Sequence, residues 1–510
     1  MMSKMANLKS LAKDTAIYGL SSIVGRFLNY LLVPLYTAKM SAASGDYGIV
    51  TNVYAYTALL LAILTYGMET TFFRFANKSE ENPRRVYSTT LITVGFTSLL
   101  FVVLVWLNIG WIAPAMGLAY TAHPDYIIVM AAVVALDAFQ AIIFAYLRYK
   151  KRAVKFAALK LLFIFANIAL NLLYFVAFPA LYKTRPDLVG VLYNPAVGVG
   201  YVFYLNLACT LLVMGCMWVE LREASWQWNR ALLGRMFNYS WPILILSVAG
   251  VINQSASQII FPKVYPGDAV ETASQLGIYG AAIKIAMIMA LITQAFRYAY
   301  EPFVFGGNRN KDDEQESKRT QALAMKYFVV FTLIAYLAVL AGIDVLKHII
   351  APDYWEGLRV VPIVMAAEIM MGIYFNLSFW YKLTDRTLWG ALFSFLGCLV
   401  LVLVNVVFVP QYGYMACAWA GVAAYATCML LSYFTGQHYY PMPYPLRDIA
   451  LYVSVTAVLS AAALWVDTGN VWLNLALRTV LLLALVALVV RREGLTSMFA
   501  RVPVVGRWFR

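Results

Sequence analysis

The sequence contains few charged residues and few residues that bind metal ions. Only 13% of its 510 residues are charged, and it has three histidines and five cysteines. The histidines are isolated and the cysteines fall within apolar runs, so no group has the spacing of a metal site. An odd number of cysteines in such runs also argues against a disulfide framework. Neither a metal centre nor a disulfide-linked scaffold is therefore expected.

Apolar residues make up 62% of the chain. A soluble domain needs more polar surface than this, so the composition predicts a polytopic membrane protein. A membrane-spanning helix needs about 20 apolar residues. Pro242 and several polar residues interrupt the seventh candidate segment. Fourteen segments in total predict an all-α fold: 14–38, 47–70, 88–108, 125–147, 156–179, 196–219, 234–259, 275–300, 323–345, 360–381, 387–409, 412–434, 447–466 and 470–490.

The net charge of +14 is unevenly distributed along the chain. Most Lys and Arg residues lie in one set of alternate loops and at both ends of the sequence, whereas the other loops have few. Loops rich in Lys and Arg stay on the cytoplasmic side of a membrane, so we expect both termini in the cytoplasm. The basic loops are expected to meet anionic lipid headgroups. This distribution argues against binding to nucleic acid.

A faint internal repeat relates the two halves of the chain. The stretch "YGIVTNVYAYTALLLAIL", which begins at Tyr47, resembles "LGIYGAAIKIAMIMALIT", which begins at Leu276. The expected topology gives both helices the same direction across the membrane, so the repeats would be parallel. Parallel repeats are one architecture of secondary transporters, in which the substrate path lies between the halves.

Ionisable residues within the predicted spans are the first candidates for function, because such residues usually pair or line a water-filled path. Two interpretations stay open. The charges form ion pairs that lock the bundle, or deep cations bind an acidic substrate while carboxylates take up protons or sodium. Lys160 lies near a basic loop and can extend to the membrane surface. The residues are Arg26, Glu69, Asp137, Lys160, Lys284, Arg297, Glu301, Glu368 and Arg478.

Uncharged polar residues accompany these charges. Asn29 shares a helical face with Arg26, and the stretch "NQSASQ" carries Asn253, Gln254 and Gln258. These groups either bond neighbouring helices or form a cavity wall, since they have no reason to face lipid. In "NLSFWYKLTDRT" (376–387), aromatic residues directly before a lysine predict a membrane-interface belt at Trp380 and Tyr381.

Four stretches together resemble the polysaccharide transporter family of the multidrug/oligosaccharidyl-lipid/polysaccharide exporter superfamily. They are "GRFLNYLLVPLYT" (25–37), "YGMETTFFRF" (66–75), "AFRYAYEPFVF" (295–305) and "NLSFWYKLTDRT". The resemblance implies two six-helix bundles, at residues 1–225 and 226–440, arranged as a V. Two further helices and a cytoplasmic tail would follow at 441–510.

The resemblance also implies a function. It implies a flippase of the bacterial inner membrane that moves an undecaprenyl-diphosphate-linked oligosaccharide from the inner to the outer leaflet by alternating access. Arg26, Lys284 and Arg297 would meet the diphosphate. Lys284 and Arg297 are about 220° apart around one helix, so both cannot face a cavity squarely. No enzyme activity or cofactor is implied. Proton or sodium coupling and a polysaccharide synthase or polymerase as partner stay open.

The stretch "YGMETTFFRF" suggests a gate. Its carboxylate and arginine lie at the expected cytoplasmic end of the second span, and "AFRYAYEPFVF" marks the corresponding end of the eighth. The complementary charges predict that Glu69 and Arg74 pair with Arg297 and Glu301, closing the inner mouth of the V when the cavity opens outward.

Two other functions are weighed against the flippase. A multidrug or cation exporter of the same superfamily fits deep cations badly, because arginine and lysine favour an anionic ligand. A membrane polysaccharide polymerase or ligase would need reactive groups on the outer face, where the loops here are short. The flippase is therefore the preferred prediction.

Overall fold

The computed structural model describes residues 30–77, 81–305 and 311–494, without the side chains of 119, 298–299, 301–303, 305 and 311–314. All regular structure in these ranges is helical. Twelve helices there are long and apolar enough to cross a membrane. The principal helices of these ranges, whether or not they are long enough to span a membrane alone, are α3 (Asp46–Thr65), α4 (Met68–Ala76), α5 (Pro83–Leu107), α7 (Pro124–Tyr149), α8 (Ala153–Leu172), α11 (Gly200–Cys216), α13 (Arg230–Val264), α14 (Ala269–Phe305), α15 (Lys311–Ala341), α17 (Val361–Leu377), α19 (Leu388–Tyr412), α20 (Tyr414–Tyr439), α21 (Leu446–Trp465) and α22 (Val471–Arg492).

The predicted all-α, multi-pass fold is confirmed. Twelve of the predicted spans coincide with the long apolar helices, and a thirteenth coincides with the shorter α11. The first predicted span falls mostly outside the described residues, so the total of fourteen stays a prediction. Helix α13 continues through Pro242, which the sequence pattern had marked as an interruption. Transmembrane helices tolerate such a proline because neighbouring groups satisfy the backbone that it frees.

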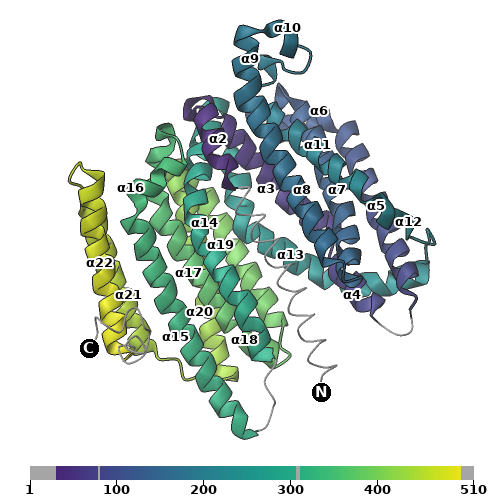
Figure 1. Cartoon of the computed structure of the whole chain (residues 1–510). Helices are drawn as coiled ribbons and strands as arrows, with labels where there is room; N and C mark the ends of the chain where they lie inside the picture. The colour runs from purple at the N-terminus through teal and green to yellow at the C-terminus, as the bar shows by residue number, and fades with distance from the viewer. Residues whose placement is uncertain (1–29, 78–80, 306–310, 495–510) are drawn as a thin grey trace. The chain divides into compact units, whose positions relative to one another are not determined.

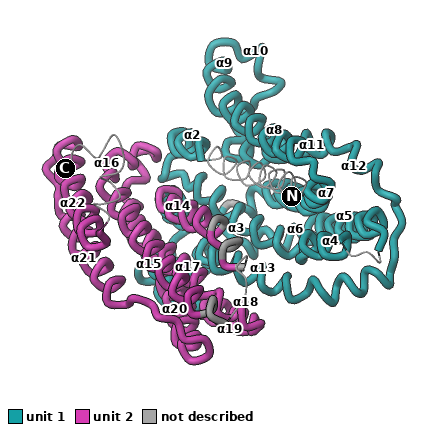
Figure 2. The backbone as a smooth tube through the Cα atoms, turned by 60° about the horizontal axis from the view of Figure 1, so that its bottom comes forward, with its two compact units in different colours: residues 1–281, 401–420 teal, residues 282–400, 421–510 magenta. Residues whose placement is uncertain are grey.

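The chain divides into two compact units, whose members are coloured separately in Figure 2. Unit 1 consists of residues 1–281 and 401–420, and unit 2 of residues 282–400 and 421–510. The division of the first 440 residues into two six-helix bundles stays a prediction. Each unit is described separately below.

In unit 1, α4, α5 and α7 pack around fully buried aromatic residues at one end of the helices. Phe72, Tyr87 and Tyr146 are all 0% exposed. The Tyr87 and Tyr146 rings are stacked with centroids 4.0 Å apart. Such rings bury a large apolar area, and stacked pairs add about 0.5–1.5 kcal/mol of stability. The core therefore fixes the short α4 against the longer helices (Figure 1).

Small residues bring the two repeat-related helices of unit 1 together. A Cβ atom added at Gly48 of α3 would lie 1.8 Å from the backbone oxygen of Ala273 in α14. One added at Gly277 would lie 3.0 Å from the backbone nitrogen of Gly48. A Cβ at Gly280 would clash in the same way with Thr51. Glycine lets helix backbones approach this closely. Gly48 and Gly277 are equivalent positions of the predicted repeat, so the two similar stretches are in contact at these glycines.

Unit 2 is built around α15, against which α17, α21 and α22 pack. In Figure 1, α21 and α22 lie side by side along α15. Ion pairs hold both ends of this arrangement: Lys326 lies 2.7 Å from Glu493, and Arg478 lies 2.9 Å from Asp344. Because α15 and α22 run in opposite directions, one pair forms near each end of the contact.

The predicted interface belt at Trp380 and Tyr381 is wrong. These side chains are only 3% and 7% exposed. They belong to a core cluster of unit 2 that also contains Phe393 of α19 and Cys428 of α20. The Trp380 Nε1 donates a hydrogen bond to the buried Ser432 hydroxyl at 3.2 Å. A partner for the indole N–H is what a buried tryptophan requires, so the aromatic pair serves packing.

Candidate functional site

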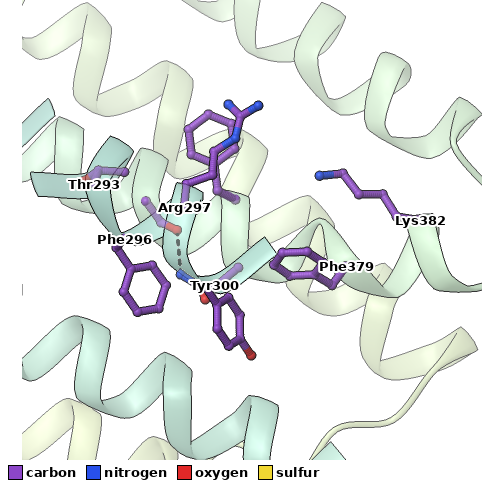
Figure 3. A pocket seen from close by; sticks show the side chains of 9 residues that line it. Thr293, Phe296, Arg297, Tyr300, Phe379 and Lys382 are labelled. Carbon is purple, nitrogen blue, oxygen red and sulfur yellow. Dashed lines mark hydrogen bonds between the residues drawn. The ribbon is translucent and has the colours of Figure 1, made fainter. Parts of the chain in front are cut away.

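A pocket in unit 2 lies among α14, α17 and the short α18 (Phe379–Leu383). It combines aromatic rings, two cations and two uncharged polar side chains (Figure 3). The lining residues are Thr293, Phe296, Arg297, Tyr300, Gly372, Phe375, Asn376, Phe379 and Lys382.

Each pocket cation lies over its own aromatic ring. The guanidinium of Arg297 lies 4.8 Å from the centroid of Phe375, and the ammonium of Lys382 lies 5.1 Å from that of Phe379. Figure 3 shows the Lys382 side chain directed toward the side of the pocket where the Arg297 guanidinium lies. A ring attracts a cation through its quadrupole and so restrains it. The helices α14 and α18 thus each contribute one positively charged side chain to the pocket.

Local sequence explains how these side chains meet. A Cβ atom at Gly372 would lie 2.3 Å from the Phe328 ring and 3.0 Å from a methyl carbon of Thr293, so only glycine lets α17 pack this closely on α14 and α15. Ser378, between α17 and α18, keeps a right-handed helical backbone. Residues three and four apart therefore share a face there, which brings Phe375, Phe379 and Lys382 to the pocket.

Two buried polar atoms in the pocket have no hydrogen-bond partner among the described residues. They are the hydroxyl of Thr293, which is 3% exposed, and the amide oxygen of Asn376, which is 9% exposed. The amide nitrogen of Asn376 donates to the Gly372 carbonyl at 3.0 Å. Buried polar groups are almost always satisfied, so such exceptions mark sites that a ligand or water completes.

Two further predicted residues lie in the membrane-spanning part of unit 2. Lys284 of α14 and Glu368 of α17 are both partly buried. Within the described part of the chain, neither forms an ion pair. Lys284 is thirteen residues from Arg297, or about 20 Å along the helix. Of these residues, only Arg297 lines the pocket.

Unit 1 carries a separate group of charges on α4, α7 and α8. The carboxylate of Glu69 accepts a hydrogen bond from Arg148 at 2.8 Å. The ammonium of Lys160 lies 4.0 Å from the Phe144 ring centroid and interacts electrostatically with Asp137 and Glu69. Asp137 and Glu69 thus both interact with the same cation, Lys160.

The proposed gate residues have other neighbours within their own units. Glu69 pairs with Arg148, and the guanidinium of Arg74 lies 4.1 Å from the Tyr239 ring centroid. The side chain of Glu301 lies outside the described residues. Since Arg297 belongs to unit 2, the predicted gate between Glu69 and Arg297 stays a prediction.

The polar stretch of α13 is divided between packing and exposure. The Gln258 backbone carbonyl accepts a hydrogen bond from the side chain of Asn52 in α3 at 2.7 Å, and the Ser257 hydroxyl accepts one from Asn405 at 3.0 Å. Asn253 is partly buried and Gln254 is exposed. Bonding between helices therefore accounts for part of this stretch. Arg26 and Asn29, the other candidates of this kind, lie outside the described residues.

The sequence predictions overlooked several residues of these sites. Lys382 had been taken only as a marker of the membrane surface, and Thr293, Asn376 and Arg148 were not singled out. Lys382 follows the aromatic run 379–381 by one position, as Arg297 follows Phe296. This recurrence of a basic residue directly after an aromatic one is the sequence signal by which Lys382 could have been identified.

Comparison with known families gives one decisive match. Residues 11–297, more than half of the chain, match the model of the polysaccharide biosynthesis protein family. The chain belongs to this family. The resemblance inferred from the four stretches is thereby confirmed. A search of curated protein sequences finds no match to this chain.

Solved structures of transporters share the fold of this chain. The lipid II flippase MurJ in an inward closed conformation aligns with a TM-score of 0.70 over 94% of this chain and 99% of its own, at 13% identity. An inward-facing multidrug resistance MATE family transporter of the MOP superfamily aligns with a TM-score of 0.61 over 83% and 97%, also at 13% identity. The chain is therefore a multi-pass membrane protein with the MurJ and MATE fold.

Proposed function

We propose that this protein is a flippase that moves a polyprenyl-diphosphate-linked oligosaccharide from the inner to the outer leaflet by alternating access. The setting would be the bacterial inner membrane, with both termini in the cytoplasm. The observation that carries the proposal is that a chain of the polysaccharide biosynthesis family has a flippase fold and a pocket lined by two cations. A lipid-linked sugar unit that is assembled on one side of a membrane and used on the other must cross it, and a polyprenyl-diphosphate carrier brings its phosphates with it.

The charge of the candidate sites favours this substrate over a drug. The same fold occurs in multidrug transporters, so the fold alone does not decide. Arg297 and Lys382 line the pocket, and Lys284 lies partly buried in the same helix as Arg297. Cations repel a lipophilic cationic drug and attract a diphosphate. Arg26, for the same reason, is proposed as a further diphosphate ligand.

The carboxylates suggest how transport is driven and gated. Asp137 and Glu368 lie within membrane-spanning helices. A carboxylate there that takes up a proton or a sodium ion would couple the gradient of that ion to transport.

The proposed partners are anionic lipids near the basic loops and a polysaccharide polymerase that accepts the flipped unit.

Two double variants, each with the charge reversed at two residues, test the predicted gate. Glu69→Arg is expected to cripple transport. If the gate forms, Arg297→Glu in the same chain restores part of the activity, whereas Arg148→Glu restores activity if only the pair seen within unit 1 matters. Rescue by Arg148→Glu alone would rule out the gate.

The function itself is tested in cells depleted of the protein. Lipid-linked oligosaccharide should accumulate on the cytoplasmic face, and the intact chain should reverse this whereas Arg26→Ala and Arg297→Ala should not. An unchanged distribution with normal surface polysaccharide would favour the drug exporter. Accumulation of unpolymerised units on the outer face would favour a polymerase.

A further inference from the structure

We propose that residues 217–228 of unit 1, which we call the strap, lie on the membrane surface and bind the headgroup of an anionic phospholipid through Trp218 and Arg222. The strap joins α11 to α13 and contains the short helix α12 (Trp218–Arg222). The inference deepens the anionic-lipid part of the proposed function. It rests on that function only for the leaflet, the inner one, because the rest requires only that the chain spans a membrane.

One face of the strap is fixed to other helices of unit 1. Met217 and Glu220 are fully buried. The Glu220 carboxylate accepts a hydrogen bond from the Lys155 ammonium of α8 at 2.7 Å. The backbone nitrogen of Ser225 donates to the Ser88 hydroxyl of α5, also at 2.7 Å. The strap therefore has a defined inner face, and the side chains on its opposite face are held outward.

The outer face of the strap is rich in exposed tryptophan. Trp218, Trp226 and Trp228 are 57%, 55% and 51% exposed. The Trp228 ring is exposed although its Nε1 donates to the Thr93 hydroxyl of α5 at 3.3 Å, so this ring is fixed in place. A cluster of large exposed apolar side chains marks an interaction surface. Tryptophan in particular is enriched where lipid meets water.

The outer face of the strap continues a lipid-facing surface of α11. Leu211 and Leu212 of α11 are exposed, as leucines that face lipid are. Trp218 and Val219 follow them by seven residues, about two helical turns, and so lie on nearly the same side. Met217, at the junction of α11 and α12, has φ −90° and ψ 6°, next to the helical region. The apolar surface of α11 therefore leads into the strap at the end of the helix.

The charges of the strap favour an anionic headgroup. Its two carboxylates are neutralised within unit 1, because Glu220 pairs with Lys155, and Glu223 lies 2.7 Å from Arg152. Arg222 is exposed, and no carboxylate pairs with it in the part of the chain that the structure describes. Further exposed cations at the same end of these helices are Arg84, Arg85, Lys150 and Lys151. A positive surface beside a membrane attracts anionic lipids.

Trp218 positions Arg222 for this role. The guanidinium of Arg222 lies 5.1 Å from the centroid of the Trp218 ring, which attracts it through the ring quadrupole. The planar guanidinium is able to donate two parallel hydrogen bonds to a phosphate group. A tryptophan at the interface thus holds an arginine at the depth of the lipid phosphates.

The test measures tryptophan fluorescence of the purified full-length protein in nanodiscs. The lipids are phosphatidylglycerol and phosphatidylcholine, each brominated near the headgroup end of its acyl chains and varied in mole fraction. Subtracting the emission of Trp218→Phe isolates the emission of Trp218. Both lipids should quench it, with a roughly fivefold preference for phosphatidylglycerol, as expected for one arginine near a membrane surface. Arg222→Gln, measured against its own Trp218→Phe partner, should lose this preference.

Two variants serve as controls. Arg222→Lys keeps the charge and should retain most of the preference for phosphatidylglycerol. Trp472 is 75% exposed at the start of α22 in unit 2, and subtracting the emission of Trp472→Phe isolates it in the same way. Arg222→Gln should leave the quenching of Trp472 unchanged.

Three results would overturn the inference. Emission of Trp218 that neither lipid quenches would place the strap away from the membrane. Equal quenching by both lipids in the intact protein would remove Arg222 from an anionic headgroup. A preference that disappears when sodium phosphate replaces sodium chloride at equal ionic strength would identify a site for a free anion. The proposed function fails separately, if the intact protein does not change the leaflet distribution of lipid-linked oligosaccharide in cells.

Discussion

Replacing Thr293 by valine should stabilise the protein while weakening its function. The Thr293 side chain is 3% exposed, and its hydroxyl has no partner among the described residues. A buried, unsatisfied polar group costs about 1–3 kcal/mol. Valine has nearly the same shape, but a methyl group takes the place of the hydroxyl and must fit in the same packed space, which offsets part of the gain. We therefore expect the free energy of unfolding to rise by about 1 kcal/mol.

A matched control is available in the neighbouring helix. Thr332 of α15 is 0% exposed, but its hydroxyl donates to the Phe328 and Val329 carbonyls, both at 2.9 Å. Thr332→Val loses these hydrogen bonds and should lower the free energy of unfolding by up to about 1 kcal/mol. Denaturant unfolding of the purified proteins, followed by tryptophan fluorescence, compares the two variants.

Stability and binding should change in opposite directions in Thr293→Val. The more stable variant should bind farnesyl diphosphate several-fold more weakly and transport more slowly, since a group kept unsatisfied for a ligand is a cost to the empty protein. Thr293→Val that destabilises the protein as Thr332→Val does would refute the reasoning. A variant that gains stability and keeps full affinity would show that the hydroxyl does not meet the ligand.

Three further predictions concern the charges that hold each unit together. Arg478 donates hydrogen bonds to two carbonyls at the end of α21 and to Asp344. Arg478→Met should therefore lower the free energy of unfolding, measured by denaturant unfolding, by about 3 kcal/mol. The control Arg491→Met, at an exposed position, should lower it by less than about 0.5 kcal/mol. Glu220→Gln should cost about 2 kcal/mol in the same assay, because the fully buried carboxylate accepts hydrogen bonds from Lys155, and an unchanged midpoint would count against this pair. Burial alone would raise the pKa of Glu223, but hydrogen bonds from Tyr146 and Arg152 outweigh burial and lower the pKa. The stability that Glu223 adds over Glu223→Gln should therefore be full above about pH 4.5 and disappear as the pH falls below that value. Thermal unfolding of both proteins across pH measures this difference.

Hydropathy alone predicted most of the fold. The apolar runs were long enough to specify helices without knowledge of their neighbours, because a lipid-facing helix must satisfy its own backbone. The same reasoning failed at Trp380 and Tyr381, where aromatic residues next to a lysine suggested the membrane surface. Their burial depends on Phe393 and Cys428, which are distant in sequence. A local pattern cannot distinguish an aromatic belt from a core cluster.

The candidate site was less predictable than the fold. Arg297 was identified by its charge within an apolar run, and it lines the pocket. Lys382, which joins it there, carried no such contrast because it precedes a polar loop. Thr293 was not identifiable at all, since an unsatisfied hydroxyl becomes visible only when its surroundings are known. Residues that matter through partners on another helix require the three-dimensional structure.

Flipping by the purified protein tests the central claim most directly. The protein is reconstituted in liposomes that contain a fluorescent polyprenyl-diphosphate-linked oligosaccharide, and a membrane-impermeant quencher reports the fraction in the outer leaflet over time. We predict that the protein exchanges the lipid between leaflets faster than protein-free liposomes do, and that Arg297→Ala combined with Lys382→Ala abolishes the difference. No acceleration over protein-free liposomes, together with transport of a lipophilic cation by the same preparation, would contradict the flippase and identify a drug exporter.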